Sequence, residues 1–128
     1  MPAPTFSKRE RIVSNKLIET LFNGKSSHSL AAFPLRAVYM QSNRPLGGEP
    51  VQILISVPKR RFKHAVDRNR VKRQVREAYR HHKQIVSACV ADDKCLQIAF
   101  IWQATELKPT GVVANSVVGL LQKIARRL

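Results

Sequence analysis

Acidic residues are scarce in this chain of 128 residues. Only 8 Asp and Glu stand against 23 Lys and Arg, which gives a formal net charge of +15. So large an excess repels itself when the chain compacts, so it calls for a reason beyond solubility. Nucleic acid is the first candidate partner, because contact with phosphates releases bound counterions. An anionic membrane surface is the second candidate.

Long apolar runs are missing too, and none approaches the roughly 20 residues that a membrane span requires. The N-terminal stretch MPAPTFSKRER lacks the apolar segment of a signal peptide, so we expect a cytoplasmic protein without a membrane partner. The two cysteines, Cys89 and Cys95, have neither C-x-x-C nor Cys/His metal spacing. We expect both to be buried free thiols in a reducing compartment, with a disulfide as the less favoured alternative.

Catalytic patterns are equally sparse. A nuclease that uses two metal ions needs several converging acids, but only Asp92 and Asp93 are adjacent, and they fall in an expected turn. His81 and His82 are neighbours that point about 100° apart on a helix. The sequence has no G-x-S-x-G, P-loop or zinc spacing. We therefore predict no catalytic residue, no metal site and no small-molecule substrate for the protein itself.

The apolar pattern predicts a single α+β domain over residues 1–128 with the order α-β-β-β-α-β-α, in which helices pack on one four-stranded sheet. Residues 1–13 are expected to be a basic, extended lead-in. Ser14 or Asn15 caps the first predicted helix, and Asn23-Gly24 ends it through left-handed conformers. Strands are predicted at 29–32, 35–41, 51–57 and 96–102, and a loop is predicted at 42–50. Two further helices are predicted, one from Asp67 to about Ala88 and one after Pro109-Thr110-Gly111.

The stretch RNRVKRQVREAYR, residues 68–80, raises the question of what its charge is for, since Glu77 is its one acid. On a helix, an arc of about 100° contains Val71, Val75, Ala78, Tyr79, His82 and Val86, and we expect this mainly apolar arc to face the core. Much of the other side is a cationic ridge, which we define as Arg70, Lys72, Arg73, Arg76, Arg80 and Lys83, with Asn69, Gln74, Glu77 and His81 between them. A merely solvated face would pair its bases with acids four residues away, but only Arg73 and Glu77 fit that spacing. The pattern favours contact with nucleic acid.

More cations gather where this helix begins. Lys59, Arg60, Arg61 and Lys63 precede it, and Arg68 and Arg70 are expected in its first turn. The helix dipole is positive there, so each cation costs about 0.3–1 kcal/mol. Free N–H groups beside guanidinium groups make a phosphate site that offsets this cost. Asn69 can either fix the local backbone or read a base or ribose edge, and the sequence leaves both open.

The stretch ISVPKRRFKHAVDRNRVKRQVREAYR, residues 55–80, resembles the signature of the bacterial ribonuclease P protein family. In that signature a strand ends in S-V-x-K-[KR], and a short link leads to R-N-R-x-K-R at a helix start. ERIVSNKLIETLFNGKS, residues 10–26, resembles the first helix of the family. The resemblance covers nearly the whole chain, and it implies a mostly antiparallel sheet with one β-α-β crossover of left-handed sense.

The resemblance also implies a function. The chain is expected to be the RNA-binding subunit of ribonuclease P, an endoribonuclease that removes the 5′ leader of precursor tRNA by hydrolysing a phosphodiester bond. Its implied partners are the catalytic RNA and precursor tRNA, and catalysis is expected in the RNA, which binds most of the Mg²⁺. By position, the implied RNA contacts are Arg68, Asn69, Arg70, Lys72, Arg73 and Arg76. With the preceding cations and Arg80, the predicted RNA-binding set also contains Lys59, Arg60, Arg61 and Lys63.

A cleft for the leader is implied at Ile18, Phe22 and Tyr39, where rings can stack on bases, with core packing as the alternative for the two aromatic residues. Ile18 occupies a position that is often aromatic in the family. The link RRFKHAV is one residue longer than usual, which alters the approach to R-N-R. Two other functions stay open: a structural RNA-binding protein of the ribosomal type, and a DNA-binding factor that inserts the basic helix in a major groove. Composition does not separate them, and the R-N-R-x-K-R signature favours ribonuclease P.

Overall fold

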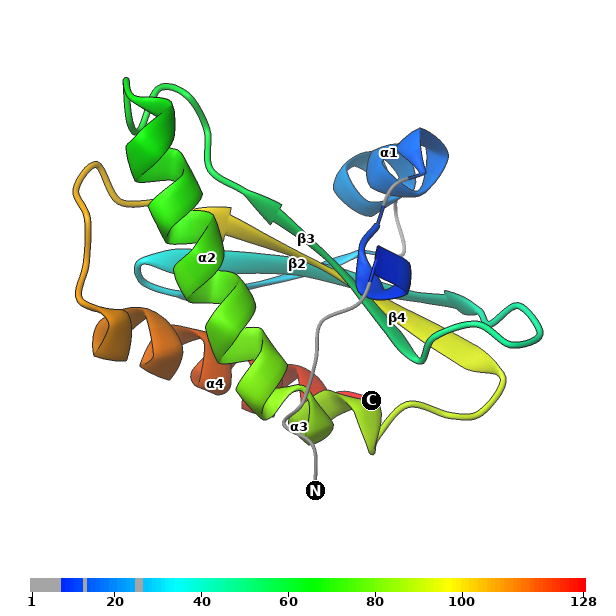
Figure 1. The fold of residues 1–128 in the computed structure, drawn as a ribbon. Helices are drawn as coiled ribbons and strands as arrows, with labels where there is room; N and C mark the ends of the chain where they lie inside the picture. The colour runs from blue at the N-terminus through cyan, green and yellow to red at the C-terminus, as the bar shows by residue number, and fades with distance from the viewer. Residues whose placement is uncertain (1–7, 13, 25–26) are drawn as a thin grey trace.

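The structure, a computed structural model, describes residues 8–12, 14–24 and 27–128 (Figure 1). Four strands form one sheet in the order β1-β2-β4-β3. Strands β1 and β2 pair antiparallel, as do β2 and β4, whereas β3 runs parallel to β4. The predicted mostly antiparallel sheet with one β-α-β connection is therefore confirmed. The strands are β1 (His28–Ala32), β2 (Leu35–Asn43), β3 (Val51–Ser56) and β4 (Lys94–Trp102).

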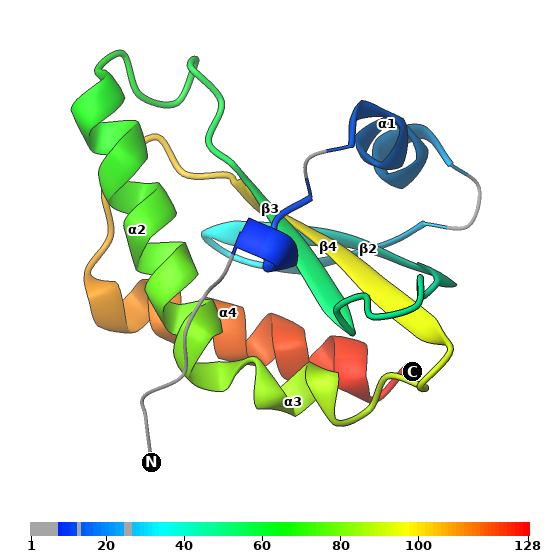
Figure 2. The same ribbon diagram turned by 45° about the vertical axis from the view of Figure 1, so that its right-hand side comes forward.

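Helices cover the sheet unequally on its two faces (Figures 1 and 2). The larger core joins one face of the sheet to α2 (Ala65–His82), α3 (Gln84–Ser87) and α4 (Thr110–Ala125). A smaller core joins the other face to α1 (Asn15–Asn23). Side chains alternate along a strand, so Ile98 and Phe100 of β4 face the larger core while Ala99 faces the smaller one. The predicted order of elements is confirmed, and the short helix α3 is added to it.

The start of α1 agrees with the prediction, whereas its end differs from it. Ser14 caps the start as predicted, because its Oγ accepts a hydrogen bond from the Leu17 N–H at 3.3 Å. The expected left-handed ending is wrong, since Gly24 has φ −75° and no non-glycine residue among those described has a positive φ. Gly24 is needed for another reason: its N–H bonds the Thr20 carbonyl at 2.7 Å, and a Cβ there would lie 2.2 Å from that oxygen.

Several element boundaries differ from the predicted ones. β2 continues to Asn43 and β4 begins at Lys94, because these two residues pair across the sheet. The guanidinium of Arg44 fixes this end of the sheet by donating to the carbonyl of Lys94 at 2.7 Å and to that of Ala91 at 2.9 Å. The basic helix begins at Ala65, two residues before the predicted start, and it ends at His82 before the separate turn of α3.

The expected extended lead-in is wrong for Lys8–Glu10, which form the short 3-10 helix η1. After it, Arg11 makes a parallel bridge with Ile53, and the Ile12 N–H donates to the Ile53 carbonyl at 2.9 Å. Ile12 is buried in the smaller core. We call residues 9–12 the edge strap, because they lie along the outer edge of β3. Residues 1–7 and 13 of the predicted lead-in lie outside the described residues.

Both cysteines are free thiols, as expected. Cys95 is buried, and burial raises the pKa of its thiol. Cys89 is exposed, so the expectation of burial is wrong for it. The segment around Cys89 follows α3 and leads toward the turn before β4.

Two glycine-to-alanine substitutions test the account of the fold. We expect Gly24→Ala to lower the free energy of unfolding by about 1–3 kcal/mol, because the added methyl group collides with a backbone carbonyl that cannot move freely. Gly119→Ala is the matched control in α4, where an added Cβ meets nothing within 4 Å and helix propensity predicts a gain of about 0.5–1 kcal/mol. Urea unfolding of both variants measures the difference, and an unchanged midpoint for Gly24→Ala would contradict this explanation of the helix end.

Candidate nucleic-acid interface

The basic helix α2 buries one face and displays the cations of the other. Val71, Val75 and Tyr79 are buried as predicted, and the Tyr79 ring packs 6.4 Å from that of Phe100 on β4. His82, which is expected on the same arc, is half-buried. Gln74, expected between the cations, is buried as well. Its Nε2 donates to the Lys108 carbonyl at 3.1 Å and to Thr110 Oγ1 at 3.2 Å, because α2 packs on the start of α4 as well as on the sheet.

The cations of the ridge are largely unneutralised. Within residues 8–12, 14–24 and 27–128, its ion pairs are Arg80 with Glu77 at 2.8 Å and Lys83 with Glu10 at 2.7 Å. The pairing of Arg73 with Glu77, suggested by their spacing, does not form. A hydrogen bond from Arg80 holds the pKa of the exposed Glu77 carboxyl below its usual value. The other four ridge residues make no ion pair in the described part of the chain: Arg70, Lys72, Arg73 and Arg76.

The start of α2 differs from the predicted phosphate site. Because the helix begins at Ala65, its first turn contains Asp67 and ends at Arg68, whereas Arg70 lies in the second turn. Arg68 Nη1 donates to the carbonyls of Phe62 at 2.8 Å and Lys63 at 3.4 Å. This guanidinium therefore holds the link that precedes the helix, a structural role that the sequence did not indicate.

The other residues of the predicted set divide by exposure. Lys59, Arg60 and Lys63 are exposed on the link, whereas Arg61 is half-buried and its Nε has no hydrogen-bond partner among the described residues. Asn69 is exposed in the second turn of α2 and makes no side-chain hydrogen bond in the part of the chain that the structure describes. Its position is too far along the helix for a cap, which leaves its amide available to a ligand.

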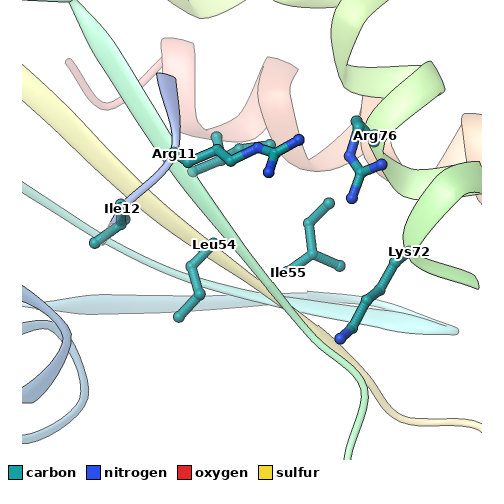
Figure 3. A pocket seen from close by; sticks show the side chains of 7 residues that line it. Arg11, Ile12, Leu54, Ile55, Lys72 and Arg76 are labelled. Atoms are coloured by element: carbon teal, nitrogen blue, oxygen red, sulfur yellow. The ribbon is translucent and has the colours of Figure 1, made fainter. Parts of the chain in front are cut away.

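A groove lies between the edge strap, β3 and α2 (Figure 3). Its volume is about 200 Å³, and Ile53, Leu54 and Ile55 of β3 line it with apolar surface. Figure 3 shows the guanidinium groups of Arg11 and Arg76 close to one another, while the Lys72 ammonium lies farther away along the groove. Cations that face each other across an apolar floor repel one another unless an anion lies between them. The remaining lining residue is Ile12.

A second hollow, of about 430 Å³, lies on the outer side of α2. Lys72 and Arg76 line it as well as the groove, so these two side chains separate two basic surfaces. Its other lining residues are Val66, Asn69 and Arg73. One helix thus presents cations to two neighbouring sites.

The three residues predicted for the leader cleft are not brought together. Ile18 is half-buried against the smaller core, and Phe22 is 43% exposed on the same helix. Tyr39 is only 4% exposed and belongs to the larger core, on the opposite face of the sheet, with its ring 5.3 Å from that of His28. The alternation of side chains along β2 explains this, since its neighbours Val38 and Met40 face α1 instead.

Arg11 and the β3 edge are the parts of the site that sequence reasoning missed. The N-terminal segment reads as polar and unstructured, and its contact with β3 joins positions 42 residues apart. One signal was present: Ile12 is an apolar residue within a basic run, just before the first helix. Apolar residues in such a run can mark a short segment that docks on the fold.

Among the described residues, His, Cys, Asp and Glu side chains do not gather in threes at any place that could hold a metal ion. None of the helices in the described part of the chain combines the length and the apolar character of a bilayer span.

Comparison with known proteins now gives the family. The sequence model of Ribonuclease P matches residues 6–124. This chain belongs to the ribonuclease P protein family. A ribonuclease P protein component from Porphyromonas gingivalis strain W83 is 37% identical over 95% of this chain and 89% of the relative. Family membership makes the chain a protein component of ribonuclease P, the endoribonuclease of tRNA 5′ processing, and RNA binding is consistent with its surface.

Solved structures show the shared fold. A mutant ribonuclease P protein of Staphylococcus aureus, described as defective in mRNA degradation, superposes with a TM-score of 0.68 at 26% identity, covering 93% of this chain and 90% of the other. The ribonuclease P protein of Thermotoga maritima has a TM-score of 0.68 at 22% identity, covering 89% and 96%. The predicted α+β class is therefore confirmed by ribonuclease P proteins themselves.

Two neighbouring arginines allow a direct test of the structural role of Arg68. We expect Arg68→Ala to lower the free energy of unfolding by about 1–3 kcal/mol, because the carbonyls of Phe62 and Lys63 lose a charged donor. Arg70→Ala is the control, since Arg70 is exposed and its loss should change stability by less than about 0.5 kcal/mol. Equal thermal midpoints for the two variants would show that the link does not depend on Arg68.

Proposed function

We propose that this ribonuclease P subunit binds two RNAs on adjacent surfaces of α2. The outer hollow, with Asn69 and Arg73, contacts the catalytic RNA, and Arg70 and the cations of the link extend that contact. The groove beside β3 takes the single-stranded 5′ leader of precursor tRNA. The observation that carries this proposal is that Arg11, Lys72 and Arg76 line one groove together with apolar side chains of β3.

The chemistry of the groove suits a single RNA strand. Guanidinium groups bind phosphate oxygens through paired hydrogen bonds, and Arg11 and Arg76 stand on the two sides where a phosphate could lie between them. The isoleucine and leucine side chains of β3 offer apolar contact to an unpaired base. A groove of about 200 Å³ is too small for the body of a double helix but accepts part of an extended strand.

Phe22 is the second element of the proposed leader path. Its ring is 43% exposed on α1, beside the same face of the sheet to which the edge strap leads. A base that stacks on such a ring gains about 1–3 kcal/mol. Tyr39 is left out of this path, because it lies in the core on the other face.

We assign the hydrolysis itself to the RNA subunit. The polar side chains of the two basic surfaces are arginine, lysine and asparagine, none of which readily serves as a general base at neutral pH. These side chains can bind and orient phosphates, so the role of the chain is to hold the precursor beside the catalytic RNA. The Mg²⁺ is assigned mainly to the RNA, where it would supply charge stabilisation to the reacting phosphate.

Reconstitution tests the proposed function. Precursor tRNA is incubated with the catalytic RNA at low Mg²⁺ concentration, with and without the protein, and cleavage at the mature 5′ end is measured. We expect stimulation by the protein, because its cations replace part of the charge screening that Mg²⁺ otherwise provides. Absence of stimulation, with RNA binding retained, would favour a structural protein of the ribosomal type.

Separate substitutions test the assignment of the two surfaces. We expect Arg11→Ala to weaken binding of precursor tRNA to the reconstituted complex by about 1–3 kcal/mol while leaving the affinity for leaderless tRNA unchanged. We expect Arg70→Ala to weaken the affinity of the protein for the catalytic RNA instead. Equilibrium binding with both substrates and with the RNA subunit measures the three affinities. An equal loss for both substrates in Arg11→Ala would exclude the groove as the leader site.

A further inference from the structure

An ion pair between a buried carboxylate and a half-buried ammonium group joins the edge strap to the end of the basic helix. Glu10 is 7% exposed, and its Oε1 lies 2.7 Å from the Nζ of Lys83, the residue between α2 and α3. The chain has only 8 acidic residues, so the burial of one of them suggests that its carboxylate has a specific structural role. Buried ion pairs add little net stability, because the cost of removing both charges from water offsets their attraction. Their better-supported use is to fix one arrangement of the chain.

Other contacts also attach the strap, and the Arg9 guanidinium donates to the Gly47 carbonyl. One parallel bridge joins Arg11 to Ile53, and the Gln52 Nε2 donates to the Arg9 carbonyl at 3.1 Å. Arg9 also lies near Glu49 at 3.7 Å, in an exposed pair that contributes little. The backbone pairing with β3 is short, consisting of this bridge and the hydrogen bond from the Ile12 N–H to the Ile53 carbonyl, and isolated strand pairs are marginally stable in water.

Arg11 follows Glu10 directly, and its guanidinium reaches into the groove opposite Arg76 (Figure 3). The backbone position of the strap therefore sets where this cation stands. If the strap leaves β3, the groove loses one of its three cations and Ile12 leaves the smaller core.

We propose that Glu10 and Lys83 are positioning residues for the RNA groove: their ion pair fastens the edge strap so that Arg11 faces Arg76. This inference rests on the proposed leader site, but its first consequence, the attachment of the strap, concerns the protein alone. Glu10 contacts no RNA in this account and acts through Arg11.

The sign of the effect separates this proposal from general electrostatics. Glu10→Gln makes the chain more positive, so charge alone predicts tighter RNA binding. The proposal predicts weaker binding of the leader, because the strap is released. Lys83→Met makes the chain less positive and releases the same strap. Both substitutions are therefore expected to act in the same direction, whereas simple charge effects would have opposite signs.

The binding experiment uses the reconstituted complex with precursor tRNA and leaderless tRNA. We expect Glu10→Gln and Lys83→Met each to lose roughly fivefold or more in the leader-dependent part of the affinity. Glu106→Gln is the matched control, because Glu106 is an exposed acid whose partner Lys108 lies 2.6 Å away, outside the strap. This control should leave the leader-dependent affinity unchanged.

Two further variants show whether Glu10 acts through Arg11. In the Arg11→Ala background, the added Glu10→Gln substitution should cause no further loss, because the positioned group is already absent. The charge-reversed pair, Glu10→Lys with Lys83→Glu, should recover part of the affinity that either single change loses. A loss from Glu10→Gln that persists in full without Arg11 would overturn the positioning role.

Hydrogen exchange of the free protein gives an answer that does not depend on RNA. The Ile12 N–H donates to the Ile53 carbonyl, so its exchange reports strap attachment. We expect Glu10→Gln to speed this exchange while amides of β4 keep their protection. Unchanged protection of Ile12, or tighter leader binding by Glu10→Gln, would overturn the inference. If the wild-type complex shows no leader-dependent affinity, the proposed leader site fails, and the Ile12 exchange still decides whether the ion pair holds the strap.

Discussion

The attachment of a strongly cationic helix to an apolar sheet is the constraint on which the rest of the structure depends. Each buried side chain such as Val71 or Val75 contributes about 1.5–3 kcal/mol. Like charges four residues apart on an exposed helix face, such as Lys72 and Arg76, cost only about 0.2–0.5 kcal/mol. The buried face therefore outweighs the repulsion across the ridge. Cations can be kept for a polyanion because the core holds the helix in place.

The topology explains where the groove lies. β3 is an edge strand, since the chain leaves it through α2 and returns to β4 on its inner side. The outer edge of β3 is thus left beside the cationic face of α2. An uncovered strand edge can pair with other chains, and the edge strap covers part of it with a single bridge. The same short segment protects an edge and supplies Arg11 to the groove.

The sharing of Lys72 and Arg76 between two hollows has a consequence for binding. A phosphate in the groove and a phosphate on the outer side of α2 can contact the same two side chains from opposite directions. Each bound phosphate lowers the repulsion that the remaining cations experience. Binding of one RNA would then change the electrostatic environment of the other, which is a physical route from RNA assembly to recognition of the precursor.

Sequence reasoning reached the parts of the fold that depend on local periodicity, and it failed where distant residues decide. The apolar stripe of α2 and the strands around Ile53 and Ile98 follow from the pattern of residues that are close together in the sequence. Gln74 looked like part of a polar face because its partners Lys108 and Thr110 come more than thirty positions later. Arg68 looked like a ligand contact because nothing local shows that the preceding link exposes carbonyls to it.

The edge strap is the clearest example of a feature that the sequence does not predict, because no local pattern reveals either its position or its role. Its ion pair joins residues 10 and 83, which a sequence pattern cannot match with each other. The sequence does show that acidic residues are few. Each of them is therefore a candidate for a specific structural or functional role. Glu77 lies beside Arg80 on the surface, whereas Glu10 is buried where the strap meets the helix. In a chain this basic, a buried acidic residue therefore marks a contact that holds the fold in one arrangement. Its contribution to the balance of charge is secondary.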